Sequence, residues 1–118
     1  MPDPTPPAGW HQSLDALLAR MPAAPAKQWV EAPLKYGTLL LGVYAPRGSD
    51  PQVPHEQDEV YIVMRGHGVF RCGTERRPIG VGDCLFVPAR VPHRFEDFSD
   101  DLALWVVFYG PKGGEEPL

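Results

Sequence analysis

The chain has 118 residues, of which 43% are hydrophobic and 22% charged, proportions that suit one soluble globular domain with a hydrophobic core. The formal net charge is -4 at pH 7, and no cluster of lysine and arginine is long enough to neutralise a run of phosphates, which argues against a nucleic-acid partner. No stretch approaches the roughly 20 apolar residues that cross a bilayer, and the N-terminus lacks a basic flank and an apolar signal core, so we expect no membrane partner and a cytoplasmic location.

Proline dominates the beginning of the chain. Four of the first ten residues are proline, so residues 1–26 are expected to form an extended lead-in that carries one short helix. The segment Ser13–Met21 places three leucines at helical spacing and has Ser13 or His11 near its cap. We therefore predict one short amphipathic helix before the main fold.

From residue 27 onward the hydrophobic period changes from about 3.6 to about 2, which is typical of strands. Turn signals rich in glycine, proline and aspartate separate the apolar runs, and no crossover helix lies between them. We predict an all-β domain over residues 27–110, with antiparallel strands in a sandwich or barrel, and a flexible tail over residues 111–118. The expected strands are Gln28–Ala32, Leu39–Tyr44, Val60–Arg65, Gly68–Cys72, Cys84–Val87, His93–Phe95 and Leu102–Tyr109.

Two of the expected strands, VYIVM and LALWVVFY, are apolar on both faces. Each face must then be covered, one by the barrel interior and the other by a second layer or a partner subunit. The sequence therefore predicts a homodimer.

Cys72 and Cys84 are the two cysteines, and they do not form a C-x-x-C pair. This excludes a four-thiolate zinc site and removes the usual signature of thioredoxin-like chemistry. We expect both thiols to be reduced and to have no chemical role.

Four histidines are present. His11 lies before the expected helix and His67 in an expected turn, and both are predicted to be exposed. His55 and His93 each follow a proline and stand at the edge of an apolar strand. An isolated histidine of this kind is more often structural than a ligand, but Glu59 stands at the mouth of the same apolar run as His55, where an inward carboxylate is costly unless it meets a cation. Two imidazoles and one carboxylate suit iron(II), manganese, nickel or zinc, with positions left open for substrate or water.

These residues lie in two segments that resemble the two motifs of the cupin superfamily. In HEQDEVYIVMRG, residues 55–66, three residues separate His55 from Glu59 and six separate Glu59 from Gly66. In GDCLFVPARVPH, residues 82–93, the spacing from Gly82 to His93 also agrees with the family pattern. The resemblance spans residues 37–110 and implies a double-stranded β-helix, the jelly-roll barrel of cupins, with His55, Glu59 and His93 as ligands of one divalent metal.

The chain departs from the cupin pattern at several positions. Val53 stands where the family has its first histidine, and it cannot bind a metal. Arg90 replaces a motif glycine, Asp97 replaces the final asparagine, and Gly48 lies one residue late. Water or a nearby amide, from Gln52 or Gln57, is expected to fill the missing ligand position, and the alternative is a barrel that keeps the motif residues without a metal.

An apolar pocket is expected beside the metal. Arginine side chains that point inward are the candidates for binding a substrate carboxylate, although solvated surface positions are the commoner fate of arginine. The predicted pocket residues are Tyr44, Tyr61, Phe86, Phe95 and Trp105, and the candidate arginines are Arg65, Arg71 and Arg90.

Three functions are compatible with these features. The first is a metal-dependent cupin enzyme acting on a small molecule, with dioxygenase chemistry if the metal is iron and isomerase or lyase chemistry if it is zinc, manganese or nickel. The second is a non-catalytic barrel that senses or stores a small molecule, which the valine at position 53 favours. The third is an interaction module that dimerises and has no ligand pocket.

Overall fold

The computed structural model of the protein describes residues 9–21, 29–50 and 53–116. It consists of strands and one short helix, and every strand pair is antiparallel. The all-β fold predicted from the sequence is confirmed. In chain order the elements are α1 (Leu14–Leu18), β1 (Trp29–Tyr36), β2 (Leu39–Tyr44), β3 (Asp58–Arg65), β4 (His67–Cys72), β5 (Glu75–Gly80), β6 (Cys84–Val87), β7 (His93–Glu96) and β8 (Ala103–Tyr109).

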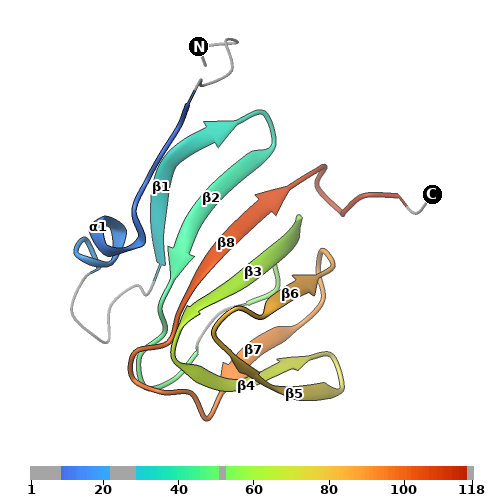
Figure 1. The fold of residues 1–118 in the computed structure, drawn as a ribbon. Helices are drawn as coiled ribbons and strands as arrows, with labels where there is room; N and C mark the ends of the chain where they lie inside the picture. The colour runs from blue at the N-terminus through green and yellow to red at the C-terminus, as the bar shows by residue number, and fades with distance from the viewer. Residues whose placement is uncertain (1–8, 22–28, 51–52, 117–118) are drawn as a thin grey trace.

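The strands form two sheets that enclose one hydrophobic core. The larger sheet has the order β1-β2-β8-β3-β6 and runs diagonally across Figure 1, and the smaller sheet has the order β5-β4-β7 and lies below it. Strands from both sheets send alternate side chains inward, because successive side chains of a strand point to opposite faces. The buried core side chains are Tyr44, Tyr61, Val63, Phe70, Ile79, Val87, Phe95, Leu102, Leu104, Val106 and Phe108.

The strand β5 has no counterpart among the strands predicted from the sequence. Three of its six residues, ERRPIG, are charged, and Pro78 lacks a backbone donor. The structure accommodates them because β5 is an edge strand of the smaller sheet, where Pro78 is paired with Val69 of β4. The prediction failed here because an edge strand needs neither an apolar face pattern nor a full set of backbone donors.

The helix α1 is shorter than the predicted segment. It begins at its N-cap Ser13, whose Oγ accepts a hydrogen bond from the backbone N of Ala16 at 3.2 Å. The backbone N–H of Met21 bonds to the carbonyl of Leu18, so the chain continues past the helix in tight turns. Leu17 is fully buried against Val43 of β2, and the helix thus covers the outer face of the larger sheet.

The segment after β8 lies against the start of β3. The backbone N of Gly113 donates to the carbonyl of Glu56 at 2.7 Å, and the N of Glu115 donates to Oδ2 of Asp58 at 2.8 Å. The expected flexibility of residues 111–118 and the domain boundaries drawn from the sequence stay predictions.

None of the helices among the described residues is long and apolar enough to cross a membrane. The cytoplasmic location stays a prediction.

Gly66 joins β3 to β4 where the backbone leaves no room for a side chain. Its φ of 78° lies in the left-handed region, which glycine adopts without strain. A Cβ at this position would lie 2.8 Å from the Cα of Leu102, in the loop that leads to β8. The turn therefore requires glycine for its conformation and for the close approach of two backbone segments.

We predict that Gly66→Ala destabilises the protein by about 2–4 kcal/mol, the sum of left-handed strain and a clash with backbone. Gly73→Ala is the matched control, because Gly73 has a φ of 60° but no atom within 4 Å of an added Cβ. Its cost should stay near about 1 kcal/mol. Urea unfolding of both variants gives the comparison, and equal losses of stability would contradict the importance of the close contact.

Candidate metal centre

The structure brings together the three side chains that the sequence analysis named as ligands. Glu59 points inward from β3, His93 opens β7, and His55 precedes β3 in the segment that enters the barrel. One potential ligand atom from each of the three lies within 4.8 Å of the others. We call His55, Glu59 and His93 the ligand trio; their role in binding a metal stays a prediction.

Glu59 is the member of the trio whose burial costs the most free energy. Its residue is 0% exposed, and neither carboxylate oxygen receives a well-directed hydrogen bond from the residues that the structure describes. Nε2 of His93 lies 2.8 Å from Oε1. A buried carboxylate without such hydrogen bonds costs several kcal/mol unless a positive charge lies beside it. The donor set of the trio therefore fits a divalent cation.

His93 is oriented by a hydrogen bond on the far side of its ring. Its Nδ1 donates to the carbonyl of Val91 at 2.9 Å, which leaves Nε2 facing Glu59 and the hydroxyl of Tyr61, 3.1 Å away. A backbone carbonyl on one ring nitrogen is the usual way in which a protein presents the other nitrogen to a metal. Burial acts to lower the pKa of His93, but the contacts with Glu59 and Val91 outweigh it, so the pKa is raised.

His55 is the least buried member of the trio. Its ring meets the edge of Phe108 with a centroid distance of 5.1 Å and lies 5.5 Å from the ring of His93. Burial, and secondarily the neighbouring His93, lower the pKa of His55, although Glu59 acts in the opposite direction. A lowered pKa favours the neutral imidazole, which is the form that binds a metal.

At two positions where the chain departs from the cupin motifs, the backbone has the left-handed conformation that glycine and asparagine adopt most readily. Arg90, in place of the glycine, has a φ of 67°, and Asp97, in place of the asparagine, has a φ of 47°. Aspartate tolerates the left-handed region better than most residues, whereas the same conformation costs more strain energy for arginine. The backbone N of Arg90 donates to the carbonyl of His55 at 2.6 Å, and this bond ties the two motif segments together beside the trio.

Asp50 holds the strand that carries His93, although in the sequence it stands in a run of turn-forming residues. Its Oδ2 accepts a hydrogen bond from the backbone N of Phe95 at 2.7 Å, and its Oδ1 accepts one from the hydroxyl of Tyr44. Because Phe95 lies on β7 two residues after His93, Asp50 fixes the edge of that strand. Asp and Pro at adjacent positions signal a turn, and nothing in that pattern indicates that the carboxylate turns inward.

The predicted pocket is partly wrong. Tyr44, Tyr61 and Phe95 are buried in the core, but Phe86 is 54% exposed and Trp105 packs with the cluster beneath the helix on the outer face of the larger sheet. The reason is the two-residue alternation of β6 and β8, which sends their neighbours inward and these two rings outward.

The predicted fourth ligand gains no support from the observed contacts. The side-chain amide of Gln57 donates to the carbonyls of Thr38 and Gly110, at 3.1 and 2.9 Å. Gln52 lies outside the described residues. Val53, at the position of the missing histidine, is 68% exposed.

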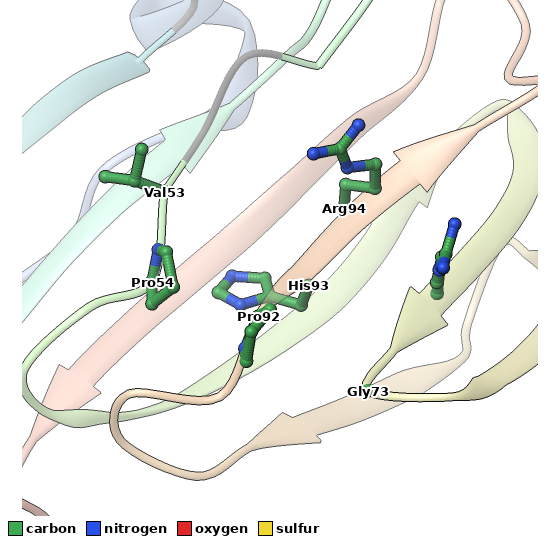
Figure 2. Close-up of a pocket in the computed structure, with 7 residues that line it drawn as sticks. Val53, Pro54, Gly73, Pro92, His93 and Arg94 are labelled. Carbon is green, nitrogen blue, oxygen red and sulfur yellow. The ribbon is translucent and has the colours of Figure 1, made fainter.

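A cavity of about 370 Å³ is lined by one member of the trio, His93. Figure 2 shows Val53 and Pro54 on one side, Arg94 on the other and His93 between them. The side chain of His93 has no exposed area, and neither His55 nor Glu59 lines the cavity. The lining residues are Val53, Pro54, Arg71, Gly73, Pro92, His93 and Arg94.

Only one of the three predicted arginines lines this cavity. Arg71 does, whereas Arg65 pairs with Asp15 of the helix and the Nε of Arg90 donates to Glu56 at 3.0 Å. Arg94 was missed, because an arginine next to a histidine in a short strand is expected to be a solvated side chain.

Comparisons with known proteins agree with this architecture. A family model described as the cupin domain matches residues 40–109. An uncharacterised protein of Streptomyces coelicolor is 38% identical over 81 residues, which are 67% of this chain and 77% of that protein.

Solved structures with the same fold have low sequence identity to this chain. A cupin 2 conserved barrel domain protein from Rhodopseudomonas palustris is similar with a TM-score of 0.61 and 18% identity, over 77% of this chain and 68% of that one. The iron(II) structure of HppE has a TM-score of 0.56 and 19% identity, over 69% of this chain and 50% of that one. This chain therefore matches half the length of HppE, and both likenesses are likenesses of fold.

Proposed function

The chain belongs to the cupin family, and on that premise we propose that it binds one divalent transition metal through His55, Glu59 and His93 and acts on a small molecule. The observation that carries the proposal is the carboxylate of Glu59, fully buried without a well-directed hydrogen bond and 2.8 Å from a histidine nitrogen. A cation at the trio would offset the cost of burying that charge. Three protein ligands leave positions open for a substrate.

The residues around the trio have separate tasks in this proposal. His55, Glu59 and His93 bind the ion, and Val91 keeps the ring of His93 turned so that Nε2 faces it. Burial, followed by the charge of Glu59, raises the pKa of Tyr61 well above its ordinary value, so its hydroxyl keeps its proton at neutral pH. That hydroxyl can donate a hydrogen bond to an oxygen atom of a substrate at the trio.

A bound divalent metal supplies Lewis acidity or, if it is iron, access to dioxygen chemistry. The iron(II) of the similar HppE structure is consistent with iron, but the donor set also suits manganese, nickel and zinc. We propose an enzyme of dioxygenase, isomerase or lyase type.

The metal centre is tested by replacing one ligand. Purified wild-type protein should bind about one iron, manganese, nickel or zinc ion per chain and melt at a higher temperature with the ion. His93→Ala should lose the ion and the stabilisation, because two remaining ligands hold it weakly. His67→Ala is the matched control, since His67 is an exposed histidine of β4 outside the trio.

Metal analysis by mass spectrometry, together with melting curves, decides the outcome. Stoichiometric metal in folded His93→Ala, or equal loss in His67→Ala, would contradict the assignment.

A second candidate function is a barrel that senses or stores a small molecule without reaction. The observation that favours it is Val53, an exposed apolar side chain where the family pattern has a histidine ligand. The two functions differ in whether a bound molecule leaves the protein changed.

We predict that the metal-loaded protein consumes a substrate from a panel of small organic acids and that His55→Ala does not. The reason is that His55 supplies one of three ligands and is the one nearest to solvent. Mass spectrometry of the panel before and after incubation detects the change. Binding with full recovery of every unchanged compound would favour the sensing or storage function.

We further propose that a second copy of the chain covers the outer face of β3 and β6. Ile62 and Met64 of β3 are 37% and 38% exposed, and Phe86 of β6, which is 54% exposed, is paired with Val60 of β3. The side chains of this face are uncharged, and β6 is an edge strand of the larger sheet. A two-fold contact between identical apolar faces would bury both faces, so a second copy of this chain is a suitable partner.

We predict that Phe86→Asp shifts the protein to monomer, because a carboxylate in the contact would have to be desolvated without a partner. Val81→Asp is the control, since Val81 is also exposed apolar surface but lies in the turn before β6. Sedimentation over a range of concentrations measures the state. A wild-type monomer at every concentration, or a Phe86→Asp dimer of unchanged affinity, would refute the contact.

A further inference from the structure

Two arginines from neighbouring strands line the cavity that His93 also lines. Arg71 of β4 and Arg94 of β7 are directly paired in the strand register. Like charges opposite each other across two strands destabilise a sheet. The chain as a whole is acidic, with a formal net charge of -4, so this pair of positive charges does not follow from general basicity.

Nearby carboxylates neutralise this pair only in part. Glu96 lies 3.8 Å from Arg71, but its closer partner is Arg76, whose Nε is 2.9 Å from the other carboxylate oxygen. Arg76 also lies 3.7 Å from Asp97. Within the described ranges, no carboxylate comes within 4.0 Å of the guanidinium of Arg94. The cavity wall therefore carries positive charge that the protein itself does not balance.

The rest of the cavity wall offers little other polarity. Val53, Pro54 and Pro92 contribute apolar surface, and Gly73 contributes backbone. Figure 2 shows Arg94 facing the side of the cavity formed by Val53 and Pro54. A volume of about 370 Å³ suits a small organic molecule.

We propose that Arg71 and Arg94 together bind the oxyanion of a small organic acid, a carboxylate or a phosphate, in the cavity that His93 also lines. The guanidinium group matches these anions because its N–H donors lie in one plane and form paired, charge-assisted hydrogen bonds. An anion between the two arginines also removes the repulsion across β4 and β7. The assignment of this anion as part of a substrate rests on the proposed metal-dependent function; the anion site itself does not.

The test uses the full-length, metal-free protein, labelled with nitrogen-15, and three probes of similar size or charge. Succinate offers carboxylates, inorganic phosphate offers a tetrahedral oxyanion, and succinamide is the neutral match of succinate. We expect succinate, phosphate or both to shift the backbone amide signal of Gly73 and the side-chain signals of Arg71 and Arg94, and succinamide to leave them in place. The tighter of the two anions identifies the substrate class.

Arg71→Gln and Arg94→Gln should each weaken anion binding by about tenfold or more, because a charge-assisted contact is lost. Arg77→Gln is the matched control, since Arg77 belongs to the same sheet, pairs with Glu75 and does not line the cavity. Its affinity should match that of the wild type. Unchanged affinity in Arg71→Gln and Arg94→Gln, equal loss in Arg77→Gln, or equal shifts with succinamide would overturn the site.

The variant His55→Ala separates this site from the metal centre. His55 does not line the cavity, so this variant should lose the metal and still bind the anion. If the wild-type protein binds succinate or phosphate at the two arginines but takes up no metal, the metal centre is wrong and the anion site stands. If metal binds at the trio and no anion binds at the two arginines, the anion site is wrong and the metal centre stands.

Discussion

A carboxylate buried beside two imidazoles is the constraint on which the site depends. Glu59 lies on β3, between β8 and β6 in the larger sheet, and is completely removed from solvent; its charge has no well-directed hydrogen bond among the described residues. Burial of such a group is unfavourable in the folded chain taken alone. A protein that retains it has a use for a charge there, and the two histidines beside it make cation binding the use with the best chemical match.

The fold positions this group through bonds made at some distance from it. Asp50 binds the backbone of β7 next to His93, and Arg90 binds the carbonyl of His55 through its backbone N. Asp58, adjacent to Glu59, accepts hydrogen bonds from the backbone of Ala89 and Glu115, each at 2.8 Å. Three segments that are far apart in the sequence are thereby fixed around one point, and small errors in any of them would move a ligand.

The two faces of the larger sheet serve different purposes. The inner face carries Glu59 of the trio and the neighbouring Tyr61. The outer face packs against α1 at β2, and at β3 and β6 it is exposed. The smaller sheet adds the arginines of the cavity on its own outer side and His93 on its inner side, because neighbouring residues of β7 point in opposite directions. One short strand thus contributes to both the ligand trio and the cavity wall.

The sequence by itself was sufficient to predict the all-β class, the short helix with Ser13 at its cap, most strands and the three members of the trio. The fold features depend on local signals, namely the two-residue period and capping chemistry, and the trio follows from the resemblance of two segments to the cupin motifs. Such signals survive without knowledge of what packs against them.

Only the tertiary structure decided which face of each strand is inside. It placed Phe86 in solvent and Trp105 under the helix, added the proline-containing edge strand β5, turned Asp50 inward, and put Arg94 on the cavity wall. The physical reason is that a strand apolar on both sides has the same sequence pattern whichever side it buries, and a polar residue shows no local sign of a partner that lies 45 positions away. The identity of the buried face, and with it the shape of the site, arises when the two sheets close on each other.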